Sequence, residues 1–161
     1  MKTFKSFKEY EDHIKKLIAT EAVYKKAALH TAGSYLKGAG KRKFGVYQKD
    51  NGLYEEWTEL KSSTQSQREK AGFSPNDPLH RSGKLMDSLE YVVKGDSVIN
   101  GSRDPIMAYQ ELGTIHIPPR PVLGAAMFES RDKIKKIISL SMKLWLTDQN
   151  IKKLKGGYGA F

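Results

Sequence analysis

Apolar residues in the first 36 positions recur at spacings of three and four, the pattern of one face of an α-helix. The positions that follow this spacing are Phe7, Tyr10, Ile14, Leu17, Ile18, Tyr24, Ala28, Leu29, Ala32, Tyr35 and Leu36. Ser6 followed three residues later by Glu9 is a capping-box start, and Gly38 is a candidate stop. The pattern predicts a long helix over residues 6–37.

A second long helix is predicted over residues 124–146 by the same spacing. Its apolar positions are Phe128, Ile134, Ile137, Ile138, Leu144 and Trp145. The prolines at 118, 119 and 121 force the preceding segment to be extended. Residues 147–161 are basic and rich in glycine, so we expect this tail to be mobile or to order only against a partner.

The middle of the chain predicts short elements. Residues 38–52 read as a basic loop with a short strand around 44–47, and residues 62–71 as a polar helix. Ser82 can cap a short helix running through Leu85, Met86 and Leu89. Residues 90–94 and 97–101 predict a hairpin, 108–112 a helix closed by Gly113, and 114–117 a third strand.

This element order predicts the α+β class, with long N- and C-terminal helices packed on a small, mainly antiparallel sheet. We expect one such domain over residues 1–146, followed by the basic tail 147–161.

Composition narrows the function classes. The chain has 161 residues and no cysteine, which excludes disulfides, thiol catalysis and cysteine-type zinc sites. No apolar run approaches the roughly 18 residues of a membrane span, and the start has no apolar core of a secretory signal. We expect a protein made and used inside the cell, without a membrane partner.

The net charge of +10 is unevenly distributed. Residues 1–49 hold 12 basic and 4 acidic residues, residues 50–130 hold 8 and 12, and residues 131–161 hold 8 and 2. Basic flanks around an acidic middle suit two kinds of contact. One is contact with a polyanion such as DNA. The other is self-association, in which the basic flank of one copy lies against the acidic middle of the next.

No convergent catalytic constellation emerges, so we expect no enzyme, no catalytic residue, no cofactor and no metal. The four histidines have no metal-binding spacing, although His80 and His116 could meet in space. A hydrolase using Glu111, or the carboxylates within 55–59, is a third and weaker reading. For Glu111, a hydrogen bond to a nearby backbone amide or a salt bridge is favoured over catalysis.

Lys41, Arg42 and Lys43, with Phe44 and Tyr47 nearby, supply cations beside rings that can stack on bases. A second cluster comprises Lys133, Lys135, Lys136, Lys152, Lys153 and Lys155. No known reader motif is present, so any DNA contact would be sequence-independent. A sequence-independent DNA-binding protein is therefore the alternative function.

Residues 57–124 carry a series of motifs in a distinctive order. They are Trp57 with Leu60, Pro78-Leu79, Ser82-Gly83-Lys84-Leu85, Ala108-Tyr109-Gln110-Glu111-Leu112-Gly113-Thr114, and Pro118-Pro119-Arg120-Pro121-Val122-Leu123-Gly124. The order resembles the virion-morphogenesis, or tail-completion, family of tailed bacteriophages and the related head–tail joining proteins of the neck. Tyr109 follows Ala108 rather than preceding it, and Leu112, Pro119 and Val122 replace Phe, Ala and Phe of the family pattern.

The resemblance implies a structural virion protein that forms a ring, a hexamer or a multiple of it, at the head–tail junction. It implies three kinds of partner: sister copies, a portal, adaptor or head-closure protein, and a tail tube or tail terminator protein. Assembly would follow synthesis in the cytoplasm of the host bacterium. Non-specific contact with the packaged DNA is also expected.

Two groups of residues are expected to make these contacts. Candidates for the subunit interface are Glu111, Gly113, Pro119, Arg120 and Pro121. Lys41, Arg42 and Lys43 are expected to face the DNA lumen or an acidic partner. Arg120, held between prolines, is well posed for a bidentate grip on a carboxylate, within its own chain or across an interface.

Overall fold

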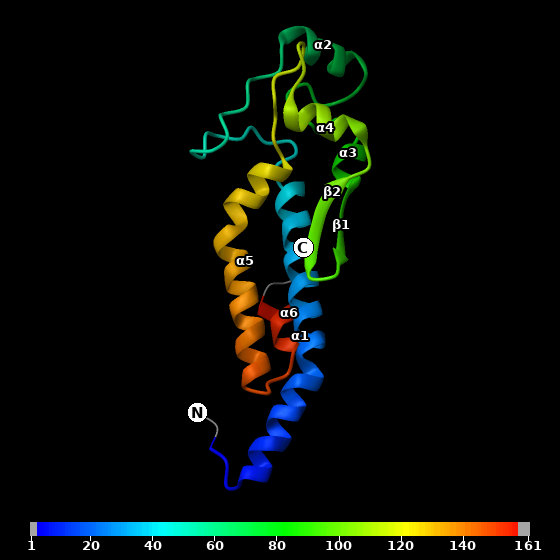
Figure 1. Ribbon diagram of the computed structural model, residues 1–161. Helices are drawn as coiled ribbons and strands as arrows, with labels where there is room; N and C mark the ends of the chain where they lie inside the picture. The colour runs from blue at the N-terminus through cyan, green and yellow to red at the C-terminus, as the bar shows by residue number, and fades with distance from the viewer. Residues whose placement is uncertain (1–2, 158–161) are drawn as a thin grey trace. The chain divides into compact units, whose positions relative to one another are not determined.

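The computed structural model describes residues 3–157. Its elements, in chain order, are α1 (Phe7–Lys41), α2 (Ser62–Lys70), α3 (Lys84–Asp87), β1 (Leu89–Lys94), β2 (Ser97–Ser102), α4 (Pro105–Leu112), α5 (Leu123–Leu146) and α6 (Lys152–Gly157). The predicted α+β class is confirmed: a long helix lies near each end of the chain, and β1 and β2 form a small antiparallel sheet (Figure 1).

The chain divides into two compact units. Unit 1 comprises Met1–Tyr35, Val93–Ile99 and Asp132–Phe161. Unit 2 comprises Leu36–Val92 and Asn100–Arg131. The helices α1 and α5 and the hairpin therefore each contribute residues to both units, and each unit has its own apolar cluster.

Unit 1 is built around helices whose contact faces carry small residues. Its buried cluster contains Ala28 and Ala32 of α1, Ile137 and Leu144 of α5, and Leu154 of α6. Alanines on α1 let the opposing side chains approach its backbone closely, and α6 packs beside α1 and α5 (Figure 1).

Polar contacts between helices add to the packing of unit 1. The Trp145 indole N–H donates to the Leu17 carbonyl at 2.9 Å, and the Ser141 hydroxyl donates to the Tyr24 carbonyl at 3.0 Å. The Tyr24 hydroxyl in turn donates to the Gln149 carbonyl at 2.6 Å. These bonds fix the register of α5 and its following turn against α1.

Unit 2 has a core made by single residues from many short segments. The buried members are Phe44, Trp57, Leu89, Met107 and Val122. Hydrogen bonds hold the connectors to one another: the Gly45 N–H donates to the Pro78 carbonyl at 2.8 Å, and the Trp57 N–H donates to the Gln48 carbonyl at 2.9 Å.

The start of α1 follows the prediction, but its end does not. The Ser6 hydroxyl accepts the Glu9 N–H at 3.2 Å, as a capping residue does. The predicted stop at Gly38 is wrong, because α1 continues to Lys41. A Cβ on Gly40 would lie 3.1 Å from Leu89 Cδ1, so the glycine allows the helix to pass close to the core of unit 2.

Two short predicted strands are absent from the described residues, and one predicted short helix has different bounds. The segment 44–47 forms turns rather than a strand. The segment 114–117 is a turn, closed by the Thr114 N–H donating to the Ile117 carbonyl at 2.8 Å, so the sheet has two strands rather than three. Gly83, not Ser82, precedes α3, and Leu89 begins β1 instead of ending that helix.

The tail also departs from expectation. Residues 152–157 form α6, and Leu154 is fully buried in the unit 1 cluster, so this part of the tail orders against its own chain. Ile151 packs against the same cluster. Residues 158–161 lie outside the described residues.

Candidate functional site

The three cations at the end of α1 do not form one basic surface. Lys41 Nζ donates to Asp87 Oδ1 at 2.9 Å, and this bond holds the pKa of the Asp87 carboxyl below its usual value. Lys43 is buried, and its Nζ lies 2.8 and 2.9 Å from the two oxygens of the Glu129 carboxylate. Only the Arg42 side chain is exposed. Lys43 therefore has a structural partner within unit 2.

The Lys43–Glu129 pair anchors an acidic segment, residues 50–56, which we call the acidic loop. Asn51 Nδ2 donates to Glu129 Oε1 at 2.9 Å, and Asn51 Oδ1 accepts the Tyr54 N–H at 2.9 Å. Burial raises the pKa of the Glu129 carboxyl, but hydrogen bonds from Lys43 and Asn51, with the Lys43 charge, outweigh burial and lower it.

The acidic loop is ordered yet presents its side chains outward. Leu53 is 59% exposed, and the side chains of Asp50, Glu55 and Glu56 are exposed around it. The Asp50 carboxylate accepts the Gly52 N–H at 2.7 Å, which closes the turn. In Figure 1 the segment projects from unit 2 as an extended loop between α1 and α2. The loop thus offers one apolar side chain among three carboxylates.

Glu111 caps the helix α5. Its Oε2 accepts the Val122 N–H at 2.7 Å and the Leu123 N–H at 3.0 Å, and its Oε1 accepts the Gly124 N–H at 2.7 Å. A carboxylate at a helix N-terminus satisfies free amides and interacts favourably with the helix dipole. The hydrogen bond to backbone amides that the sequence favoured for this residue is confirmed.

Gly113 closes α4 with a backbone that other residues rarely adopt, at φ 73° and ψ 175°. A Cβ at this position would lie 3.0 Å from the Ile117 carbonyl oxygen and from Pro119 Cδ. Gly113 therefore allows the turn 114–117 and the proline segment 118–121 to fold back along α4. Of the prolines, Pro121 is buried and Pro119 is exposed.

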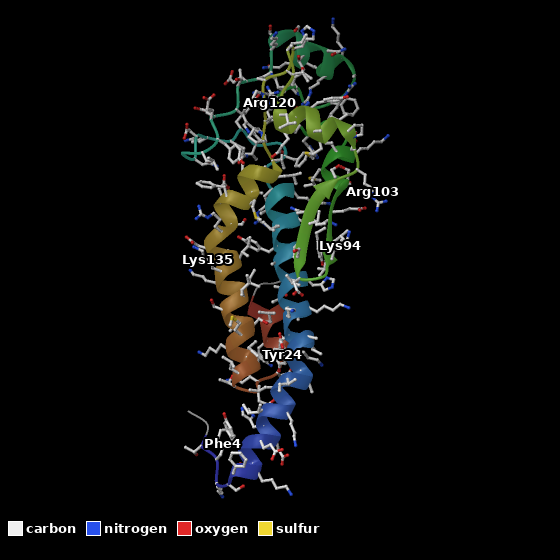
Figure 2. The ribbon with its side chains drawn as sticks, in the orientation of Figure 1. Phe4, Tyr24, Lys94, Arg103, Arg120 and Lys135 are labelled. Carbon is white, nitrogen blue, oxygen red and sulfur yellow. The ribbon has the colours of Figure 1, made fainter. Side chains whose placement is uncertain are left out.

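Arg120 lies inside unit 2, on the segment between α4 and α5 (Figure 2). It is 5% exposed; its N–H donates to the Gln110 carbonyl at 2.6 Å and its Nη2 to the Thr58 carbonyl at 2.8 Å. Its Nε is buried without a hydrogen-bond partner, and no carboxylate among residues 3–157 forms a salt bridge with it. Burial lowers the pKa of the guanidinium.

Arg120 contributes to the wall of a pocket of about 630 Å³, which we call the basic pocket. Its charged lining residues are Lys61, Arg68, Arg81, Lys84 and Arg120, against Glu59 and Asp104. Leu60, Leu79, Leu85, Ile106, Ile117 and Pro118 supply its apolar walls. The pocket thus combines an excess of positive charge with apolar surface, and suits an anionic group attached to an apolar one.

A second surface feature is an apolar stripe. Ile106, Tyr109 and Leu112 recur every third residue along α4, and Ile115 follows in the next turn. Their exposed fractions are 49%, 55%, 80% and 94%. Singly exposed apolar residues are ordinary, but four at a regular spacing on one short segment point to an interaction surface.

Of the residues expected at a subunit interface, Glu111, Gly113, Arg120 and Pro121 stabilise unit 2 itself, and Pro119 is exposed. Sequence reasoning missed the apolar stripe, although the three-residue spacing from 106 to 115 was visible. It also missed that the carbonyls of Gln110 and Thr58 accept hydrogen bonds from Arg120. These contacts join segments that are separate in the sequence, so no local pattern indicates them.

Within the part of the chain that the structure describes, no group of three or more His, Asp or Glu side chains is placed to hold a metal ion. His116 is one of the residues that line the basic pocket, and it is exposed. None of the helices in residues 3–157 has the length and apolar character to cross a bilayer.

Comparison with known proteins adds no relative. No family model matches the chain, and neither the curated proteins nor the solved structures contain a match.

Proposed function

We propose that this protein is a structural component of a tailed-phage virion, forming a ring at the head–tail junction and joining the tail to the DNA-filled head. The proposal begins from the motif order within residues 57–124, which resembles the tail-completion and neck families. In this role the protein binds its neighbours and catalyses no reaction.

The apolar stripe is the single observation that carries this proposal. Ile106, Tyr109, Leu112 and Ile115 lie in and beside the resembling motif at 108–114, and all four are exposed in the single chain. Leaving such surface in water is unfavourable by about 25 cal/mol per Å² of apolar area. A second copy that covers the stripe removes this cost, which supports a contact between sister chains at the stripe.

A ring needs two different patches on each copy, because a heterologous contact repeats around an axis until it closes. We assign the stripe and the exposed Pro119 to one such patch. The faces of the ring then contact a portal, adaptor or head-closure protein on one side and a tail tube or terminator on the other.

The test is the assembly state of the chain and its place on the particle. Leu112→Ser with Ile115→Ser removes the two most exposed stripe residues without touching the core. We expect light scattering after size exclusion to show a ring for the wild type and a monomer for this variant. Ile138→Ser with Met142→Ser, two exposed apolar residues of α5, is the matched control and should leave the ring intact.

Particles carrying a labelled chain give the second readout. We expect the label at the junction of head and tail. A wild-type chain that stays monomeric, or a label found elsewhere on the particle, contradicts the proposal.

A second candidate function, sequence-independent DNA contact, is favoured by the charge of unit 1. The unit holds 15 basic and 7 acidic residues, whereas unit 2 holds 13 and 11. Its exposed cations include Lys135 and Lys136 on α5; Figure 2 labels Lys135. A gel-shift series at two salt concentrations tests this function, since phosphate contacts make affinity fall steeply with salt. Monomeric, salt-sensitive binding would favour it over the ring.

A further inference from the structure

The basic pocket contains a cation, Arg120, that forms no salt bridge with any carboxylate of residues 3–157. Arg120 is almost completely buried, its one side-chain hydrogen bond reaches a neutral carbonyl, and its Nε has no partner. A buried charge is costly unless an opposite charge or further hydrogen bonds compensate it. The other cations of the pocket, such as Arg68 and Arg81, add to the field at this point rather than cancel it.

The same wall also contains an acceptor without a donor. Gln110 lines the pocket, and its Oε1 is buried with no hydrogen-bond partner. A ligand that satisfies both atoms must bring a negative oxygen for Arg120 and an N–H for Gln110. Inorganic phosphate offers mainly acceptors, whereas a peptide segment with a carboxylate side chain offers both. Because Arg120 Nε and Gln110 Oε1 are both shielded from solvent, their side chains must rotate before a ligand can form hydrogen bonds with them.

The apolar walls specify the rest of the ligand. Leu60, Leu79 and Leu85 line one pocket with Ile106 and Ile117, enough to surround one aliphatic side chain. The ligand that fits is thus an acidic peptide with an apolar residue beside its carboxylates.

One segment of this chain has that composition and is exposed. The acidic loop presents Leu53 among Asp50, Glu55 and Glu56. Its hydrogen bonds to Glu129 and within its own turn hold it in a defined conformation, so little entropy is lost when it binds. The loop is not among the residues that line its own chain's pocket, so a loop that enters this pocket would come from another copy.

We propose that the basic pocket of one copy binds the acidic loop of a second copy, with Leu53 against the apolar walls and the Glu55–Glu56 carboxylates facing the pocket cations. Pocket and loop are different patches, so the contact is heterologous and repeats from copy to copy. The inference rests on the proposed ring and names the partner and the chemistry of one of its contacts.

A charge exchange between the two patches tests the contact. The pocket variant carries Arg81→Glu with Lys84→Glu, and the loop variant carries Glu55→Lys with Glu56→Lys; all four side chains are exposed, so folding should persist. Each variant alone juxtaposes like charges, and we expect self-association to weaken by at least about tenfold. Mixed in equal amounts, the two variants pair acidic loop with basic pocket and basic loop with acidic pocket, and association should return.

Two further variants test whether the loss of association depends on the contact itself or only on the net charge of the chain. Lys135→Glu with Lys136→Glu makes the same change of charge as the pocket variant, on exposed residues of α5, and should leave association unchanged. Leu53→Ala keeps every charge and should weaken association about tenfold, because a leucine side chain then loses its burial in the pocket. Circular dichroism confirms that each variant is folded.

The outcomes distinguish the two proposals. If the wild type forms a ring that both charge variants also form, the loop–pocket contact is overturned and the ring stands. If mixing fails to restore association, the contact is likewise overturned. Stabilisation of the chain by inorganic phosphate, with unchanged association of both charge variants, assigns the pocket to a free anion and also overturns it. A wild-type chain that never associates overturns both proposals.

Discussion

In unit 1 the apolar core lies along repeating faces of helices, whereas in unit 2 it takes single residues from short segments that polar and backbone contacts hold together. In unit 1, Ala28 and Ala32 of α1 belong to the same buried cluster as Ile137 of α5 and Leu154 of α6, on regular helix faces. In unit 2, the Glu111 carboxylate joins α4 to the start of α5, and Lys43, in the turn after α1, is bound to Glu129 of α5. When one side chain of a regular helix face is substituted, the side chains of neighbouring turns still make the same kind of contact. In unit 2, each contact between segments depends on one side chain, so its substitution removes the contact.

The same difference separates their surfaces. Unit 1 carries most of the net positive charge, and unit 2 carries the basic pocket, the acidic loop and the apolar stripe. Specific recognition needs side chains fixed at defined positions, which the anchored segments of unit 2 provide. Four predictions test how far the two units differ, from the largest effect to the smallest.

The largest effect is expected for removal of a core side chain from each unit. Trp57→Ala in unit 2 should lower the free energy of unfolding by about 3–5 kcal/mol, and Leu154→Ala in unit 1 by about 2–5 kcal/mol. Urea titration measures both, and amide exchange should accelerate most in the unit that carries the change. Leu53→Ala, at an exposed site, should cost under about 0.5 kcal/mol. A loss from Leu154→Ala as small as that of Leu53→Ala would show that α6 is not packed on unit 1.

Gly113→Ala should cost about 3 kcal/mol. The alanine must adopt a backbone that is strained for any residue with a Cβ, and that Cβ meets the Ile117 carbonyl and Pro119. The control is Gly95→Ala in the hairpin turn, where φ is 58° and the Cβ meets nothing, at about 1 kcal/mol. Equal losses in thermal or urea unfolding would mean that the turn after α4 moves freely to accept a side chain.

Glu111→Ala should cost about 2 kcal/mol, because three amides at the start of α5 lose a charged acceptor. Glu111→Gln retains an acceptor oxygen without the charge, so its loss should be intermediate. Amide exchange at Val122, Leu123 and Gly124 should accelerate in both variants, more strongly in Glu111→Ala. Unchanged exchange at these amides would contradict the cap.

The smallest effect is expected for the stability of unit 2 at acidic pH. The pKa of the Glu129 carboxyl is lower in the folded chain than its ordinary 4.5, so its interaction with Lys43 and Asn51 stabilises unit 2 above that value. This contribution is lost as pH falls from 4.5 through the lowered pKa. Because the side chain is partly solvated, we expect about 0.5 kcal/mol or less.

The amide protection of residues 50–56, that is, their exchange rate relative to the intrinsic rate at the same pH, measures the acid effect, and it should fall in this acidic range for the wild type. In Glu129→Gln the protection of the loop should already be lower near neutral pH and should not fall further through this range. Wild-type protection that does not change with pH would contradict the role of Glu129 as the anchor of the loop.

Much of the fold could be predicted because it depends on local periodicity. The helix predicted over 124–146 and the hairpin around Gly95-Asp96 match α5, β1 and β2 within a residue or two. The stop at Gly38 failed because a glycine also serves where a helix passes close to another segment. The neighbour that decides this, Leu89, lies far along the chain.

The candidate site could be predicted only in part. The bond between Glu111 and backbone amides was one of two stated alternatives, because a carboxylate in an apolar stretch needs donors. The burial of Arg120 and Lys43 depends on Thr58, Gln110 and Glu129, which the fold brings together from separate segments. Charge patterns along the sequence show that lysines and arginines are present, but not which of them face solvent.

The docking of Leu154 determines where the chain can be cut or extended. A shortened version designed to omit the glycine-rich end has to retain residues 151–154, since cutting before Ile151 opens a hole between α1 and α5. An affinity handle or fluorescent fusion for imaging particles is accordingly better attached ahead of α1 than joined directly behind α5.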